Sequence, residues 1–280
     1  MYRNLCTCFL IFIKGYYIIK RGEVYPILLE FGRLKIYSID LLFALAIMIG
    51  GLVIFTVAKR EKLVVSDFIN FILWIVFAGF LGAKLFYLIL YFSDFKNLSE
   101  VLKIWQGGLV SWGGYIFGFL AGYIWLKREG KSPAEIMKWF GVGALGLLAG
   151  IIIGRIGCFL NGCDYGKITD SALGVVFRSV DSAKRHPTQL YESIFSLIVF
   201  MGLGWLYFKK GFNLKLIFWF FIVFYSMIRF IIDFYREGMV FWLFLTLGQW
   251  FSLILIIIAM LILYQSRSEI SPKKMGKKWR

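Results

Sequence analysis

Seven long apolar stretches, separated by short polar segments, dominate the pattern along the chain. They cover roughly residues 36–58, 68–92, 108–126, 139–160, 190–208, 214–235 and 243–264. A helix needs about 20 residues to cross a hydrocarbon core of about 30 Å, so each stretch spans or nearly spans a bilayer. The pattern predicts an all-α, polytopic integral membrane protein with about seven transmembrane helices.

The composition agrees with a membrane protein. The 280 residues are 60% hydrophobic with a mean hydropathy of +0.77, which is not typical of soluble domains of this length. Because seven spans leave no room for a separate soluble domain, we expect one membrane domain over residues 25–266. We expect an N-terminal extension or interfacial segment at 1–24 and a basic cytoplasmic tail at 267–280.

Basic residues gather after the first, third, fifth and seventh apolar stretches. Since cytoplasmic loops are enriched in Lys and Arg, this pattern places those loops and the C-terminus in the cytoplasm. The N-terminus and the long loop 161–189 are then outside, although six Lys and Arg residues among the first 35 oppose this orientation. Anionic lipid headgroups account for the net charge of +16, so we expect membrane lipids and no nucleic acid as partners.

A single arginine, Arg155, follows the apolar run 139–153 and lies among glycines in the segment 154–166. A guanidinium stays charged at any accessible pH, and burying it in a membrane is costly unless an anion or water contacts it. The position therefore predicts a binding site for a negatively charged group. Cys158 and Cys163 flank the following turn, either as small packing residues or as a disulfide. Their spacing and the one histidine of the chain disfavour a metal site.

A second charged group consists of Arg229, Asp233 and Arg236. The spacing i, i+4, i+7 places all three side chains on one face of a helix. Two interpretations stay open. Either the carboxylate neutralises one guanidinium and leaves the other for an external anion, or the group is a closed structural ion pair. Lys84, in the second stretch, similarly either snorkels toward water or pairs with another group.

The segment 185–192 opens the fifth stretch with several polar residues. Pro187 suits the first turn of a helix, and Gln189 and Glu192 share one helical face. The only histidine, His186, is either a hydrogen-bonding residue or a chemically active one. The glycine-rich segment 107–114 precedes the third stretch, where its paired glycines either expose backbone N–H groups to an anion or allow close helix packing.

These three groups of residues all lie near the outer leaflet in the predicted topology. Arginine binds phosphate with two parallel hydrogen bonds, so an anionic lipid headgroup with its tails in the bilayer suits them. A lipid-modifying transferase fits these features better than an ion channel, which needs no phosphate clamp.

The residues resemble the prolipoprotein diacylglyceryl transferase family of bacteria. The family pattern Gly-Arg-x-Gly-x-Phe-x-x-Gly is met at 154–162, and His-Pro-Ser/Thr-Gln-Leu-Tyr-Glu is met at 186–192. Arg-Phe-x-x-Glu-x-x-Arg is met at 229–236, with Asp233 in place of the glutamate. Gly-Gln-x-x-Ser appears at 248–252, and Gly-Ala-Arg appears at 82–84 with Lys84 as its third residue. The elements keep the family's order over roughly residues 25–265.

Two departures from the family pattern matter for the chemistry. Many members have His-Gly-Gly where this chain has Trp112-Gly113-Gly114, and tryptophan is not a base. Many also carry Asp and Pro early in the helix that leads to the arginine, whereas the stretch 141–145 has neither. A catalytically altered homologue that binds phospholipid is therefore kept as an alternative, together with a membrane transporter.

The resemblance implies a seven-helix enzyme of the bacterial cytoplasmic (inner) membrane. It would transfer the diacylglyceryl group from phosphatidylglycerol to the lipobox cysteine of a preprolipoprotein signal peptide, with no cofactor and no metal. The residues expected to act in catalysis are Arg155, Arg229, His186 and Asp233. Those expected to bind the phosphatidylglycerol headgroup are Gly154, Arg155, Asn161, Gln189, Tyr191, Glu192, Arg236, Gly113 and Gly114.

Overall fold

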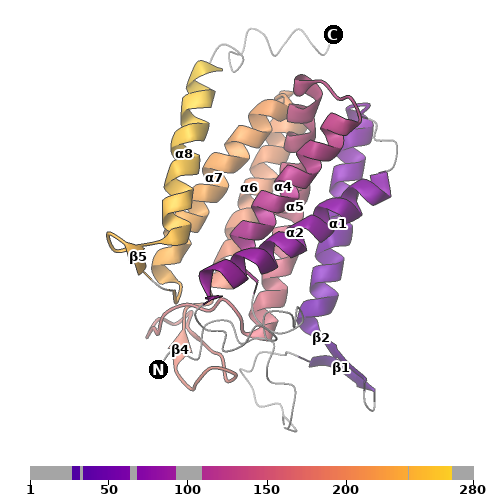
Figure 1. Cartoon of the computed structure of the whole chain (residues 1–280). Coiled ribbons are helices and arrows are strands. Elements are labelled where there is room, and N and C mark those ends of the chain that lie inside the picture. Colours follow the sequence, from indigo (N-terminus) through magenta and orange to yellow (C-terminus); the bar gives the residue numbers. More distant parts are fainter. Residues whose placement is uncertain (1–26, 32–33, 64–67, 93–108, 239, 267–280) are drawn as a thin grey trace. The chain divides into compact units, whose positions relative to one another are not determined.

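A computed structural model describes residues 27–31, 34–63, 68–92, 109–238 and 240–266 (Figure 1). The predicted extension at 1–24, the tail at 267–280 and the glycines at 107–108 lie outside the described residues. The described part holds seven helices, which confirms the all-α membrane architecture. They are α1 (Ser38–Arg60), α2 (Phe68–Leu90), α4 (Ser111–Arg128), α5 (Pro133–Asn161), α6 (Thr188–Lys210), α7 (Leu214–Tyr235) and α8 (Leu247–Gln265).

Six of these helices are long and apolar enough to cross a membrane, and α4, with 18 residues, is the exception. Three short antiparallel hairpins join or precede them within the described residues. Strand β1 (Ile27–Phe31) pairs with β2 (Leu34–Tyr37), and β3 (Val175–Val176) pairs with β4 (Lys184–Arg185). Strand β5 (Val240–Trp242) pairs with β6 (Leu245–Thr246) immediately before α8.

The chain forms two compact units, and the first contains residues 64–136 with α2 and α4. Glycines allow these two helices to touch along their backbones. A Cβ atom on Gly113 would lie 2.2 Å from the carbonyl oxygen of Gly82, and one on Gly114 would lie 3.3 Å from that of Gly79. The amide of Val110 also donates to the carbonyl of Ala83 at 3.0 Å. Small residues thus fix this helix pair through close approach.

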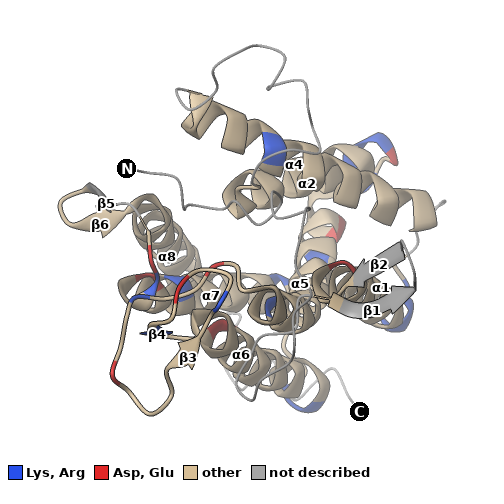
Figure 2. Ribbon diagram, turned by 90° about the horizontal axis from the view of Figure 1, so that it is seen from below, with Lys and Arg blue, Asp and Glu red and all other residues tan. Residues whose placement is uncertain are grey.

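The second unit contains residues 20–63 and 137–280, with α1, most of α5, and α6, α7 and α8. Helix α5 is the most buried of these, together with α7. It touches α1 where Gly50 faces Gly146, and it touches α7 where Gly141 faces Leu214. Helix α7 packs against both α6 and α8. Figure 2 views this unit from below and shows charged residues among α6, α7, α8 and the loop that carries β3 and β4.

The two ends of this helix bundle differ in their charge. The ends of α1 and α6 carry Lys59, Arg60, Lys209 and Lys210, and Gly211, in the left-handed region with a φ of +67°, ends α6. The opposite end carries the C-terminus of α5 and the N-terminus of α6. Arg155 lies six residues before the end of α5, which places it about 9 Å along the helix from that end.

Candidate active site

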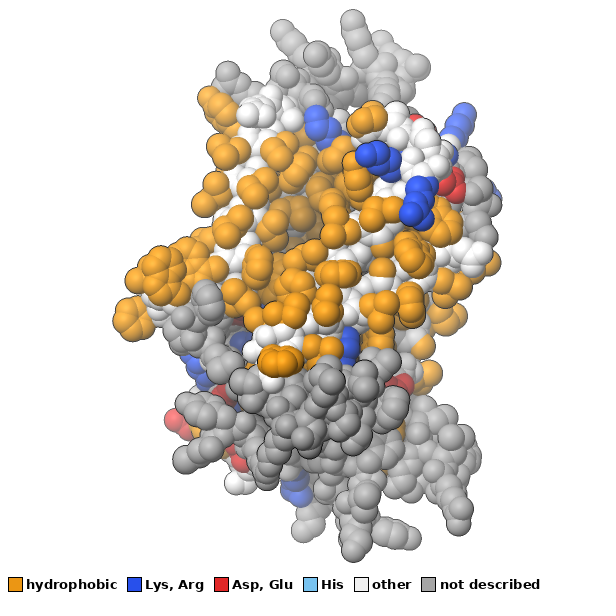
Figure 3. All heavy atoms as spheres, viewed as in Figure 1, with side chains coloured by type: hydrophobic (Ala, Val, Ile, Leu, Met, Phe, Trp, Pro, Cys, Tyr) orange, Lys and Arg blue, Asp and Glu red, His pale blue; other side chains and the backbone are white. Residues whose placement is uncertain are grey.

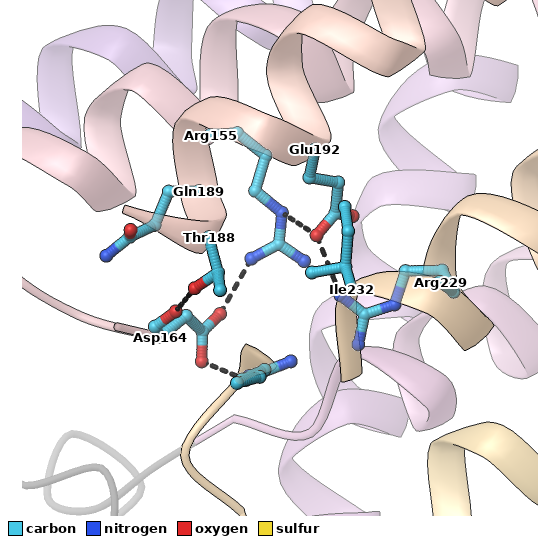
Figure 4. A pocket seen from close by; sticks show the side chains of 8 residues that line it. Arg155, Asp164, Thr188, Gln189, Glu192, Arg229 and Ile232 are labelled. Carbon is cyan, nitrogen blue, oxygen red and sulfur yellow. Dashed lines mark hydrogen bonds and ion pairs between the residues drawn. The ribbon is translucent and has the colours of Figure 1, made fainter. Parts of the chain in front are cut away.

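The candidate site is a cluster of charged side chains from α5, α6, α7 and the loop after α5 (Figure 4). The structure brings together Arg155 from α5, Glu192 from α6, and Arg229 from α7, which three separate sequence segments had supplied. The complete lining is Arg155, Asp164, Thr188, Gln189, Glu192, Arg229, Ile232 and Arg236.

Arg155 is buried and is held by two carboxylates. Its Nη1 donates to Oδ2 of Asp164 at 2.7 Å, and its Nε lies 3.1 Å from Oε2 of Glu192. The guanidinium therefore has its charge compensated from two sides, by the loop and by α6. This compensation explains how an arginine is tolerated within an apolar helix.

Glu192 is the central acceptor of the cluster. Its Oε2 accepts from Nη1 of Arg229 at 2.7 Å as well as facing Arg155, while its Oε1 accepts from the hydroxyl of Tyr225 at 2.9 Å. Because only 2% of its side chain is exposed, both oxygens are committed to partners away from water. Glu192 thus fixes the two arginines of α5 and α7 relative to each other.

Asp233 supports Arg229 from its own helix. Its Oδ1 accepts from Nη2 of Arg229 at 3.1 Å, one helical turn away, and its Oδ2 accepts from the hydroxyl of Thr246 at 3.0 Å. Asp233 thus neutralises Arg229, a pairing that both interpretations of the i, i+4, i+7 spacing contain. Arg236 takes no part in that pair and instead turns to Asp164.

Asp164 is the one carboxylate of the cluster that lies on a loop. It bridges Arg155 and Arg236, and its own carbonyl accepts from the hydroxyl of Thr188 at 2.8 Å. Burial alone would raise the pKa of Asp164, but the positive charges of Arg236 and Arg155 overcome this effect and hold the pKa well below its usual range. Asp164 is therefore ionised at neutral pH.

The charges of the cluster balance, and the side chains nearly fill the site. Three arginines face three carboxylates, and the partly open space between the lining residues is about 150 Å³, with no interior gap wide enough for a water molecule. An incoming anion must therefore compete with a carboxylate for a guanidinium. Gln189, another lining residue, donates through Nε2 to the carbonyl of Cys163, while its buried Oε1 has no hydrogen-bond partner among the residues that the structure describes.

His186 lies beside the cluster and is not one of the lining residues. Its backbone pairs with Gly166 and Lys167, with N–O distances of 2.9 and 3.0 Å. Its Nδ1 lies 3.2 Å from the hydroxyl of Tyr191, and its ring lies 5.2 Å from the ring of Tyr235. These contacts place the imidazole in an aromatic setting formed by α6 and the end of α7.

The structure also places the glycines and the asparagine that the sequence analysis expected to bind the headgroup. Gly113 and Gly114 belong to the first unit, and their amides donate to the carbonyl of Val110, so their observed contacts favour the packing interpretation. Gly154 lies on α5 next to Arg155, and Asn161 ends that helix.

Two further polar sites are also resolved. Cys158 and Cys163 are buried free thiols, which confirms the packing interpretation over a disulfide. Lys84 pairs with an aromatic ring, since its Nζ lies 5.3 Å from the ring centroid of Tyr87. Within the described residues, no group of three or more His, Cys, Asp or Glu side chains could hold a metal ion.

Sequence reasoning missed several residues of the cluster. Asp164, Thr188 and Thr246 were not singled out, nor was Tyr225 within the apolar stretch of α7. Two of these left a usable signal, because Asp164 is an acidic residue within the glycine-rich segment 154–166 and Thr188 belongs to the motif at 186–192. Tyr225 and Thr246 are revealed only by tertiary contacts.

A second ionic group lies on the loop side of the site. Arg185 pairs with Asp181 through Nη2 at 2.6 Å and with Glu237, and its Nη1 also donates to the carbonyl of Gly166 at 3.3 Å. The hydrogen bonds that Arg185 donates to Asp181 raise the pKa of Arg185, and the same contact lowers the pKa of Asp181. This group joins hairpin β3–β4 to the segment that follows α7.

Comparisons with known proteins agree with the geometry. The family model described as prolipoprotein diacylglyceryl transferase matches residues 26–265. A phosphatidylglycerol–prolipoprotein diacylglyceryl transferase of Rickettsia bellii is 30% identical over 260 residues, covering 87% of this chain and 96% of that protein. Proteins of the same name are 30% identical in Ehrlichia ruminantium (86% of this chain, 96% of that protein) and 31% identical in Clostridium tetani (75% and 85%).

Proposed function

The chain belongs to the prolipoprotein diacylglyceryl transferase family, and we propose that it transfers the diacylglyceryl group of phosphatidylglycerol to the lipobox cysteine of preprolipoproteins. The observation that carries this proposal is the cluster of two buried arginines, Arg155 and Arg229, with the partly exposed Arg236, near one end of a bundle of apolar helices. A lipid phosphate is the anion that reaches such a place with its acyl chains still in the bilayer. A transporter gains no specific support from this geometry.

The substrate phosphate would replace Asp164 as the partner of Arg155 and Arg236. Asp164 is the displaceable carboxylate because it lies on a loop and 22% of its side chain is exposed, against 2% for Glu192. Its φ of +58° is one that asparagine and aspartate tolerate better than most residues do. In this proposal the ligand-free site carries its own anion, which gives way to the headgroup and returns when the product leaves.

The reaction follows from the charges that the arginines can stabilise. The cysteine sulfur forms a bond to the glyceryl carbon, and the bond from that carbon to the phosphate oxygen breaks. The product is a thioether, and glycerol 1-phosphate leaves with the electron pair of the broken bond. Arg155 and Arg229 would stabilise the negative charge that grows on the leaving phosphate, a role in which positioned cations are effective away from water.

A proton must leave the cysteine thiol, because the thiolate is the nucleophile. Glu192 is poorly suited to accept it, since both of its oxygens already bind Arg155, Arg229 and Tyr225. We assign this proton to His186, directly or through a water molecule, because imidazole is the commonest general base and this residue adjoins the cluster. Asp233 positions Arg229 and does not itself touch the substrate.

The remaining binding residues would contact the polar headgroup around the phosphate. The buried Oε1 of Gln189 offers a hydrogen-bond acceptor to a hydroxyl of the headgroup glycerol. Tyr191 and Asn161 lie at the beginning of α6 and the end of α5, the helix termini nearest the cluster. Gly154 keeps the α5 surface small beside Arg155.

The proposed location is the bacterial cytoplasmic membrane, with the N-terminus outside and the C-terminus in the cytoplasm. The basic ends of α1 and α6, with Lys59, Arg60, Lys209 and Lys210, support this orientation through the positive-inside rule. The arginine cluster, at the opposite end of the bundle, then faces the outer leaflet, where a secreted signal peptide presents its cysteine.

The direct test uses phosphatidylglycerol labelled in its diacylglyceryl part, a lipobox peptide and the purified protein in lipid. We expect transfer of label to the peptide, loss of transfer in Arg155→Ala, and near-normal transfer in Lys167→Ala, which removes an exposed cation from the adjoining loop. Membrane insertion of both variants is checked alongside. Absence of transfer by the unchanged protein, under conditions where an active relative works, would instead identify a catalytically altered homologue.

A further inference from the structure

The hairpin β5–β6, between α7 and α8, ends in a turn of unusual chemistry. Its two tip residues, Leu243 and Phe244, have φ values of +48° and +61°. Two-residue hairpin turns with positive φ at both positions are normally built from Asn and Gly, because side chains such as Leu and Phe are strained there. A turn exposed only to water would gain stability from Asn-Gly, so the apolar pair points to a function of the tip.

The tip side chains are also among the most exposed apolar groups of the described chain. Phe244 is 92% exposed, and Leu243 and Trp242 are 59% and 60% exposed. The segment 239–245 consists of seven consecutive apolar residues without a charge. Such a surface in water is unfavourable, and an exposed apolar patch of this kind indicates a partner.

The base of the hairpin is fixed to α8 by aromatic contacts. The rings of Trp242 and Trp250 stack with centroids 5.3 Å apart, and the indole N–H of Trp250 donates to the carbonyl of Trp242 at 3.1 Å. The hairpin is therefore held in a defined direction. Figures 1 and 2 both show it projecting outward from the end of α8, away from α7.

The apolar tip lies next to a helix with an exposed apolar surface. Helix α8 is a candidate membrane span, and its exposed residues include Ile254, Ile257 and Leu261. Figure 3 shows many hydrophobic side chains along the visible side of α8 and on the projecting hairpin. Tryptophan is enriched at the boundary between hydrocarbon and water, where Trp242 and Trp250 would lie.

We infer that hairpin β5–β6 is a membrane anchor, whose tip residues Leu243 and Phe244 enter the hydrocarbon of the leaflet beside the arginine cluster. The partner of this surface is the acyl-chain region of the bilayer, and the absence of charge in the segment 239–245 means that hydrophobic burial drives the contact. The depth of the tip is therefore independent of the anionic lipid content and of the salt concentration.

The anchor is connected to the cluster through Thr246, the last residue of the hairpin. Thr246 caps α8 by accepting from the amide of Gln249 at 3.1 Å, and its hydroxyl donates to Asp233, which holds Arg229. Lipid contact at the tip thereby fixes the level of Arg229 relative to the headgroups. This second role rests on the proposed transferase function, whereas the insertion of the tip does not.

The test of insertion measures the depth of a spin label in vesicles. The label is placed at Phe244→Cys in a Cys6→Ser, Cys8→Ser background, where the remaining thiols of Cys158 and Cys163 are buried. Ile257→Cys serves as the lipid reference and Lys167→Cys as the water reference. We expect the tip label to be accessible to oxygen and protected from a water-soluble relaxation agent, as at Ile257, in both zwitterionic and anionic vesicles.

A tip label as accessible to the water-soluble agent as the Lys167 label would overturn the inference. The inference would also be overturned if the tip label were protected from the water-soluble agent only after addition of a signal peptide, or only at protein concentrations where two copies associate. The Cys6→Ser, Cys8→Ser protein without an added cysteine, treated with the same spin-label reagent, controls for labelling at other positions.

The coupling to the cluster is tested with the tip exchange Leu243→Asn, Phe244→Gly. Asn-Gly suits the positive φ values, so this variant keeps or raises the thermal stability in detergent, and any functional effect comes from the lost apolar tip. We expect a several-fold loss of transfer in vesicles and a smaller loss in mixed micelles, where no leaflet sets the level of the hairpin. If the variant were as active as the unchanged protein in both vesicles and micelles, the anchor would have no influence on Arg229. Transfer by the unchanged protein in the same assay distinguishes this outcome from failure of the proposed function.

Discussion

The molecule contains two ionic groups built from the same residue types in different surroundings. In the cluster, Arg155 and Arg229 are buried between helices with the carboxylates Glu192 and Asp233, which are only 2% and 7% exposed. Arg236 and its partner Asp164, on the loop side, are 25% and 22% exposed. The loop group of Arg185 pairs with Asp181 and Glu237, which are 37% and 46% exposed. Arg185 itself is only 7% exposed, so the burial of the carboxylates, and not that of the arginine, separates the candidate active site from the structural loop contact.

The comparison shows in which group the removal of one ion-pair partner has a large effect on the protein. Water can solvate the carboxylates of the loop group when Arg185 is removed, so such pairs contribute little. In the buried cluster a charge that loses its partner has no water to replace it, and it either destabilises the protein or attracts another ion. An anionic substrate is such an ion. The same property that makes the cluster costly thus makes it suited to bind a phosphate.

The largest expected effect is the loss of activity in Arg155→Lys. Lysine keeps the charge but offers no planar fork for two parallel hydrogen bonds to phosphate, so transfer should fall by about 100-fold or more. The measurement is the initial rate of diacylglyceryl transfer at saturating phosphatidylglycerol. Arg185→Lys is the matched change in the loop group, and we expect it to retain most of the activity. Similar losses in both variants would remove the contrast between the two groups.

The second effect is a loss of stability in Glu192→Gln. This change leaves Arg155 and Arg229 without their shared anion in a site enclosed by helices, which costs about 3–5 kcal/mol for a buried pair. Thermal unfolding in detergent should therefore shift to a clearly lower temperature. Glu237→Gln provides the control, because that carboxylate is 46% exposed. A Glu192 variant as stable as this control would show that water or a bound anion already reaches the cluster.

The sequence predicted most of the helices because apolar length is a strong and local signal. The helix boundaries that it misplaced depend on capping. Helix α5 begins at Pro133, where Ser132 and Glu135 exchange side-chain contacts, although the apolar run begins only at 139. Helix α8 begins at Leu247, since Thr246 and Gln249 form a capping box, and the apolar residues before it form a hairpin.

The site was predictable to the extent that its residues stand out as charges in apolar segments. Arg155, Arg229 and Asp233 did so. Tyr225 did not, because a tyrosine within an apolar run is ordinary, and its bond to Glu192 depends on how α6 and α7 pack. The partner of Arg236 was equally hidden, since Asp164 is separated from it by 72 residues. Ion pairs between residues so distant in the sequence produce no recognisable spacing pattern from which they could be predicted.

The third expected effect, of intermediate size, is stronger product inhibition in Asp164→Asn, and it tests the role of Asp164 in the cluster. Asp164→Asn removes the anion that occupies Arg155 and Arg236 but keeps the shape of the side chain and tolerates the φ of +58°. We expect glycerol 1-phosphate to inhibit the variant several-fold more strongly, since the product no longer competes with an internal carboxylate. The measurement is the inhibition constant, with Asp181→Asn as the control. Weaker inhibition in Asp164→Asn would mean that Asp164 organises the phosphate site and is not displaced from it.

The smallest expected effect concerns the pH dependence of the loop group. The hydrogen bonds that Asp181 accepts from Arg185 lower the pKa of Asp181, so the folded state favours the ionised carboxylate. A lowered pKa contributes stability above the unfolded value of about 3.9, and this contribution is lost as the pH falls through the folded value. Because Asp181 is exposed, we expect less than about 1 kcal/mol. Hydrogen exchange of residues 175–185, corrected for intrinsic rates, should show slightly less protection in Asp181→Asn at pH 7, and the difference should shrink as the pH falls below the unfolded value of about 3.9. A difference that persists in acid would indicate that the hydrogen-bond geometry of Asp181, and not its charge, holds the loop.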